Sequence, residues 1–134
     1  FRYFGSDIGM NDTPDEAGLG AFVRPEKGEF VGREAVLSAR AAGAPARRLR
    51  TLLVGEGEWL PLYGGEAILA DGAPIGRLRS AGYGYTVGRA LGMGYLPTEL
   101  PEGTRVGVDA LGTSVPAVIV GDTVHDPAGE RMRG

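Results

Sequence analysis

The sequence contains no cysteine and only one histidine among its 134 residues. The lack of cysteine excludes disulfide bonds and thiolate chemistry, and a lone histidine cannot complete a usual zinc ligand set. No apolar run approaches the ~18 residues of a membrane-spanning helix. The net charge of −3 gives no electrostatic reason to expect nucleic acid or an anionic membrane as a partner. We therefore expect a globular protein, which we place in the cytoplasm.

Recognisable catalytic arrangements are also scarce. His125 precedes Asp126, which could place an imidazole beside a carboxylate. A serine nucleophile also needs an exposed, strained turn, and Ser38, Ser80 and Ser114 lack that sequence context. We therefore interpret His125 as a surface or packing residue.

Glycine, by contrast, is abundant: there are 24 glycines, scattered without a period, together with nine prolines. This pattern favours many tight turns between short strands. Asp71-Gly72 and Gly112-Thr113 each separate two apolar stretches and predict hairpins. The strands that we predict cover residues 47–54, 67–70, 73–80, 90–96, 106–111 and 115–120. The fold class is therefore mostly β, with a small barrel or a jelly-roll-like arrangement.

The first third of the chain has a different pattern. We predict a short helix capped by Thr13, a strand over 20–24 and a longer helix over 30–43. Ala44-Pro45-Ala46 is a natural linker, so residues 1–43 and 46–134 form two predicted units.

The stretch from Gly82 to Arg89 places two tyrosines, Tyr83 and Tyr85, among glycines. Such a stretch can form the wall of a site for a flat heterocycle such as a pterin, because aromatic rings offer stacking area. The alternative is a glycine-rich barrel loop whose tyrosines pack on the core.

Several motifs occur in an order and spacing that resemble one known family. They are residues 1–8, 12–19, 28–35, 61–66, 80–88, 90–97 and 126–133. Together they resemble the T-protein family of aminomethyltransferases. Their details are most similar to the branch fused to flavin-dependent dimethylglycine or sarcosine dehydrogenases.

The resemblance implies a fold and an activity. Residues 1–43 would be the C-terminal end of a folate-binding α/β domain, and residues 46–134 the C-terminal β-barrel. The family transfers a one-carbon unit to tetrahydrofolate. Its key aspartate and a pterin-binding glutamate lie upstream of the motif that opens this chain, so we expect no catalytic residue here. Since the chain begins with Phe1 rather than Met, we expect a segment of a longer enzyme that does not turn over alone.

The resemblance also implies candidate folate contacts. Tyr3 or Phe4 falls where the family carries a tyrosine facing folate, and a basic residue between Arg24 and Lys27 falls near the arginine that meets the folate tail. Tyr83 and Tyr85 fall in a loop near the folate site. The implied cofactors are tetrahydrofolate and, on an upstream domain, FAD. The implied partners are an amine donor and either a lipoyl carrier protein or a fused flavin domain. The alternative function is a non-catalytic folate-binding or structural barrel module.

Overall fold

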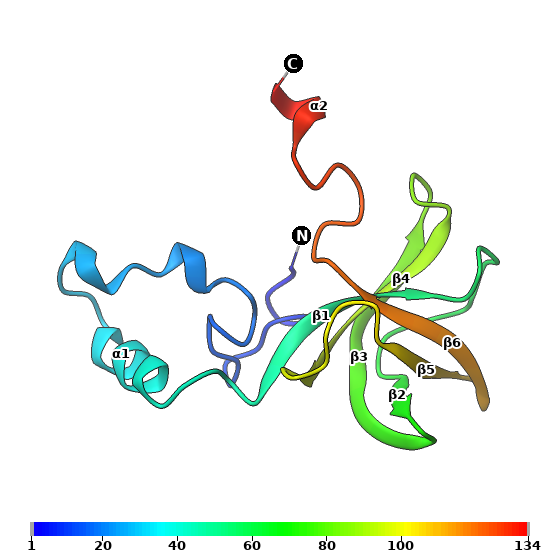
Figure 1. Cartoon of the computed structure of the whole chain (residues 1–134), viewed down its shortest axis with the longest axis horizontal. Helices are drawn as coiled ribbons and strands as arrows, with labels where there is room; N and C mark the ends of the chain where they lie inside the picture. Colours follow the sequence, from blue (N-terminus) through cyan, green and yellow to red (C-terminus); the bar gives the residue numbers. More distant parts are fainter. Residues whose placement is uncertain (1, 134) are drawn as a thin grey trace.

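The computed structural model describes residues 2–133 and places six strands in one closed antiparallel barrel (Figure 1). Around the barrel the strands follow the order β1-β4-β3-β2-β5-β6. Their bounds are β1 (Arg47–Val54), β2 (Ala67–Ala70), β3 (Ala73–Gly84), β4 (Arg89–Pro97), β5 (Arg105–Ala110) and β6 (Thr113–Val120). The predicted mostly β fold with a small barrel is confirmed.

The barrel interior is filled by aliphatic side chains from all six strands. The buried core contains Leu52, Val54, Ile68, Leu78, Ala90, Leu96, Val106, Val108, Ala117 and Ile119. Because side chains alternate along a strand, Leu52 and Val54 point inward, whereas Leu49 and Thr51 point outward. Leu49 and Thr51 are nevertheless 1% and 5% exposed. The outer face of β1 must therefore be covered by residues from outside the barrel.

Both predicted hairpins form, with turns that need left-handed backbone. Asp71 and Gly72 have φ of 48° and 79° between β2 and β3. Leu111 and Gly112 have φ of 53° and 82° between β5 and β6, one residue earlier than we predicted. Two successive positive φ angles match the twist of the flanking strands. The Asp109 carboxylate accepts a hydrogen bond of 2.8 Å from the Gly112 amide and supports the second turn.

Residues 2–46, which we call the first segment, form an irregular stretch beside the barrel and are drawn in blue and cyan in Figure 1. It contains the 3₁₀ turns η1 (Gly20–Phe22) and η2 (Pro25–Lys27) and the helix α1 (Arg33–Ala41). The predicted helix is confirmed but starts later, after Gly32 at φ 90°. The strand predicted over 20–24 is wrong, because the Val23 amide bonds to the Gly20 carbonyl at 3.1 Å and closes a turn.

The cap predicted at Thr13 is present, although the backbone that follows forms only a turn. The Glu16 carboxylate accepts from the Thr13 amide at 2.8 Å, and the Glu16 amide donates to the Thr13 hydroxyl at 3.2 Å. These reciprocal bonds are the capping box that the sequence suggests. After β6 the chain ends in a tail with a short helix, α2 (Glu130–Arg133). Phe1 and Gly134 lie outside the described residues, and the predicted division at 43–46 stays a prediction.

Candidate functional site

A groove of about 660 Å³ lies along β1, β3 and β4, between Arg2 and residues 122–125. We call it the terminal groove. Its lining consists of Arg2, Thr51, residues 80–84, Val87, residues 91–93 and residues 122–125. Thr51 pairs with Met93, and Met93 with Ser80, so these three outward positions lie side by side on neighbouring strands. The groove thus uses part of the outer surface that the barrel itself leaves uncovered.

The terminal groove combines an apolar body with a few polar groups. Val87, Leu91 and Met93 supply the apolar surface. Charged and polar side chains stand on the first segment and on the tail, where Arg2 faces Asp122 at 2.7 Å. Apolar lining with a small number of placed polar groups is typical of small-molecule sites.

The two tyrosines singled out in the sequence lie together but differ in exposure. Tyr83 lines the groove, is half-buried against the core cluster, and donates a hydrogen bond of 3.0 Å to the Gly57 carbonyl. Tyr85 is 87% exposed, and its ring packs edge-on against Tyr83 with centroids 5.2 Å apart. Tyr83 pairs with the core residue Ala90, so its ring packs toward the barrel core, and Tyr85 is not among the residues that line the groove. Their contact with a ligand stays a prediction.

Tyr3 and Phe4 stand on a turn that is fastened to the edge of the groove. Asp7, only 3% exposed, accepts a hydrogen bond from the Tyr3 amide at 2.8 Å and another from the Ser80 hydroxyl. The side chains of Tyr3 and Phe4 are themselves exposed. The structure thus places both residues next to the groove, but neither of them belongs to its lining.

A charged cluster next to this turn holds the first segment on β1, β3 and β4. The Asp12 carboxylate is 2.8 Å from Arg47 Nη2 and 3.2 Å from Arg79 Nη2. Both guanidinium groups lie over the ring of Tyr95, at 4.7 and 5.6 Å from its centroid. Burial raises the pKa of Tyr95 to about 12. Since these groups satisfy one another, we interpret the cluster as an anchor rather than as a reactive site.

Glu16 extends the same anchor along the first segment. Its carboxylate lies 2.9 Å from Arg47 Nε, and its carbonyl accepts a bond of 2.8 Å from the Leu49 amide. Burial alone would raise the pKa of Glu16, but hydrogen bonds from Thr13 and Arg47 lower it below its ordinary value. The anchor explains why outward-facing Leu49 is buried.

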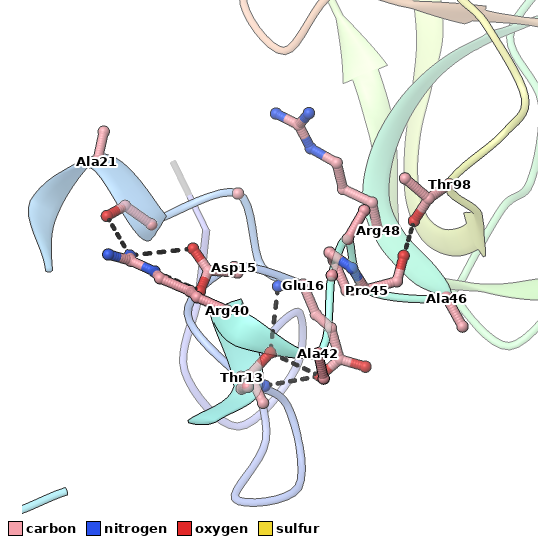
Figure 2. A pocket seen from close by; sticks show the side chains of 15 residues that line it. Thr13, Asp15, Glu16, Ala21, Arg40, Ala42, Pro45, Ala46, Arg48 and Thr98 are labelled. Carbon is pink, nitrogen blue, oxygen red and sulfur yellow. Dashed lines mark hydrogen bonds and ion pairs between the residues drawn. The ribbon is translucent and has the colours of Figure 1, made fainter. Parts of the chain in front are cut away.

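A second, wider cleft of about 920 Å³ lies between the first segment and the start of β1 (Figure 2). Its central charges neutralise each other: Arg40 binds both oxygens of Asp15, at 3.0 and 3.1 Å, and donates to the Gly20 carbonyl at 2.9 Å. In Figure 2 the Arg48 guanidinium lies apart from this pair. With its main cation already saturated, this cleft is the weaker candidate for binding a ligand.

Arg24 and Lys27 are not brought to either cleft. Both are exposed beside η2, at the end of the first segment that lies away from the barrel in Figure 1. They line neither the terminal groove nor the wider cleft. A role for them in holding a folate tail stays a prediction.

The sequence did not point to Arg2, Thr51, Met93 or Asp122 as site residues. Arg2 and Asp122 are 120 positions apart, and no local pattern links them. Across residues 2–133, no three histidine, aspartate or glutamate side chains converge to hold a metal. In the same part of the chain, no helix is long and apolar enough to cross a membrane.

Comparison with known proteins gives a consistent result. Residues 47–126 match the family model for the glycine cleavage T-protein C-terminal barrel domain. Over 99% of its length the chain is 34% identical to mouse mitochondrial dimethylglycine dehydrogenase, of which it covers 16%. Over 87% of its length it is 40% identical to an aminomethyltransferase of Streptomyces coelicolor, of which it covers 32%.

A solved structure agrees with these sequence similarities. The glycine cleavage system aminomethyltransferase T from Bartonella henselae superposes with a TM-score of 0.81 and 27% identity, over 91% of this chain and 34% of that protein. The chain thus spans between 16% and 34% of the length of these relatives.

Proposed function

Because the chain belongs to the glycine cleavage T-protein family through its C-terminal barrel domain, we propose that it is the C-terminal part of a tetrahydrofolate-dependent aminomethyltransferase. The observation that carries the proposal is the similarity across nearly the whole chain to both an aminomethyltransferase and a dimethylglycine dehydrogenase. These relatives support a folate-related one-carbon transferase family. The fused branch would add FAD on another domain, and the stand-alone branch a lipoyl carrier protein. A cytoplasmic location belongs to the same proposal, although animal relatives are named as mitochondrial.

The terminal groove fits a folate-sized ligand. Its volume of about 660 Å³ lies within the roughly 300–1,000 Å³ of small-molecule sites. When bound, tetrahydrofolate supplies the nitrogen atoms that accept the one-carbon unit. Tyr83, as one of the lining residues, would border the ligand, and Ser80 would offer a hydroxyl at the edge.

In this proposal the 134-residue chain positions the ligand, and groups elsewhere in the longer protein carry out the chemistry. Holding reactants in a productive geometry and excluding water are themselves large contributions to rate. Tyr3, Phe4, Arg24 and Lys27 are exposed and so are accessible to other parts of a longer polypeptide. We propose that they complete the folate site there.

The test is an assay of 5,10-methylenetetrahydrofolate formation by the longer polypeptide that contains this 134-residue chain. We expect Tyr83→Ala to raise the KM for tetrahydrofolate, while the control Tyr63→Ala, on an 80% exposed side chain, leaves it unchanged. Circular dichroism of each variant separates a lost contact from an unfolded barrel. An unchanged KM in a folded Tyr83→Ala enzyme would contradict the assignment of Tyr83. Folate binding without product from any amine donor would favour the non-catalytic module.

A further inference from the structure

The arginines at the start of β1 carry positive charge that the proposed function does not use. Arg47 belongs to the anchor on the outer face of the strand. Arg48 and Arg50 stand on the opposite face, which continues into the barrel core. Because they are two residues apart on one face, their Cα atoms are separated by roughly 6–7 Å. Two guanidinium groups thus project from neighbouring positions at the end of the barrel where β1 begins.

These two guanidinium groups are poorly satisfied. Within residues 2–133, three of their buried nitrogen atoms have no hydrogen-bond partner, namely Nε of Arg48 and both Nε and Nη2 of Arg50. The carboxylates that face them lie too far away, with Asp122 Oδ2 at 3.8 Å from Arg48 Nη2 and Glu102 Oε1 at 4.0 Å from Arg50 Nη2. A hydrogen bond between such charged groups would be about 2.7–2.9 Å long. Asp122 is instead bonded to Arg2, at 2.7 Å.

The burial of Arg50 makes this arrangement costly. Only 11% of its side chain is exposed, against 43% for Arg48. A guanidinium stays protonated in proteins, and a buried charge is unfavourable unless it is both paired and hydrogen-bonded. The Glu102 side chain is 65% exposed, and at 4.0 Å such a solvated carboxylate contributes little. The two arginines therefore present charge and donors that no residue from 2 to 133 satisfies.

The wider cleft gives a ligand access to this position. Arg48 and Thr98 are among its lining residues, at the end of the cleft next to β1. The charges of Arg40 and Asp15 neutralise each other elsewhere in the cleft. Figure 2 draws no ion pair or hydrogen bond to the Arg48 guanidinium. This end of the cleft is therefore open to an anion.

We infer that Arg48 and Arg50 together bind a phosphate group at this end of the wider cleft. Arginine suits phosphate because its planar fork of donors matches two oxygen atoms at once. A tetrahedral phosphate has further oxygen atoms for the second guanidinium, whereas a planar carboxylate has only two in all. The ligand is inorganic phosphate or a phosphate monoester. This site goes beyond the proposed function and does not involve folate.

The experiment is a calorimetric titration of the full chain with inorganic phosphate at constant ionic strength. We expect the natural chain to bind, and Arg50→Met and Arg48→Met each to weaken binding by about tenfold or more, because each removes hydrogen bonds to a charged group. The matched control Arg105→Met changes an exposed arginine on β5 and should bind like the natural chain.

Two further measurements support the titration. Circular dichroism should show that Arg50→Met is folded, because this variant replaces an unpaired buried charge with an apolar side chain of similar length. Arg48→Met tests the same site at a more exposed position. A titration with glycerol 1-phosphate separates the two ligand sources: tighter binding than phosphate assigns a monoester, and equal or weaker binding assigns the free ion.

Three results would overturn the inference. The first is no binding of either compound at millimolar concentration, which would mean that water satisfies the two arginines. The second is natural affinity in folded Arg48→Met and Arg50→Met chains, which would place the phosphate elsewhere. The third is acetate binding as tight as that of phosphate, which would mean that the arginines attract any anion. None of these results depends on whether the longer polypeptide forms methylenetetrahydrofolate.

Discussion

The barrel buries many side chains in its own core, whereas the first segment leaves most of its side chains exposed. Ten side chains, all from strands, form the barrel's core cluster, and the closed sheet leaves no unpaired edge strand. In residues 2–46 only Asp7, Ala17 and Pro25 are buried. Seven of the eleven large exposed apolar side chains lie in this segment: Tyr3, Phe4, Met10, Phe22, Phe30, Val31 and Leu37. The barrel is held by its own core, whereas the segment depends on its neighbours.

The contact between the two regions is correspondingly polar. Asp12, Glu16, Arg47 and Arg79 supply most of it, with Tyr95 beneath the two arginines. Such bonds specify a geometry, but partly exposed ion pairs add little free energy. Because the barrel has its own apolar core and its contact with the first segment is polar, we expect that the position of the first segment can be altered without unfolding the barrel.

The largest expected effect is a cavity in the barrel core. Leu52→Ala removes a fully buried side chain and should lower the free energy of unfolding by about 2–5 kcal/mol. The measurement is urea denaturation followed by circular dichroism. Leu37→Ala, on the half-exposed face of α1, is the control and should cost less than about 1 kcal/mol. Equal losses at the two sites would contradict the distinction between a self-supporting barrel and a dependent segment.

A smaller and local effect is expected from Asp12→Ala. The change leaves Arg47 and Arg79 without their shared carboxylate and should destabilise the contact by about 1–2 kcal/mol. We expect faster amide hydrogen exchange in residues 2–46, with exchange in β1 to β6 almost unchanged.

Glu29→Ala is the matched control, because this exposed carboxylate lies 3.6 Å from Arg33 within the segment and does not touch the barrel. If Asp12→Ala instead lowered the stability of the strands as much as Leu52→Ala, the two regions would form one cooperative unit.

The same contrast explains what could be predicted from the sequence. The barrel strands follow from local signals, namely apolar alternation and turns such as Asp71-Gly72. The strand predicted over 20–24 was wrong because the alternation there is short and a glycine-bounded turn competes with it. The groove could not be predicted for another reason: Arg2 and Asp122 are 120 positions apart and meet only in the folded chain. Tyr83 stands out in the sequence as an aromatic residue among glycines, but its contact with a ligand stays a prediction.

The smallest effect at neutral pH is expected at Tyr95, where the two regions meet. Its buried hydroxyl has no hydrogen-bond partner within residues 2–133, so Tyr95→Phe should change the stability at pH 7 by less than about 0.5 kcal/mol. At alkaline pH the free energies of unfolding of the natural chain and of Tyr95→Phe should become different. Because burial raises the pKa of Tyr95 from 10.0 to about 12, the unfolded chain releases this proton first as the pH rises. Its contribution is therefore complete below pH 10 and is lost between pH 10 and about 12. Urea denaturation across this range should show a steeper decline for the natural chain than for Tyr95→Phe. Parallel curves would mean that the ring is open to solvent and that the segment does not cover β4 in solution.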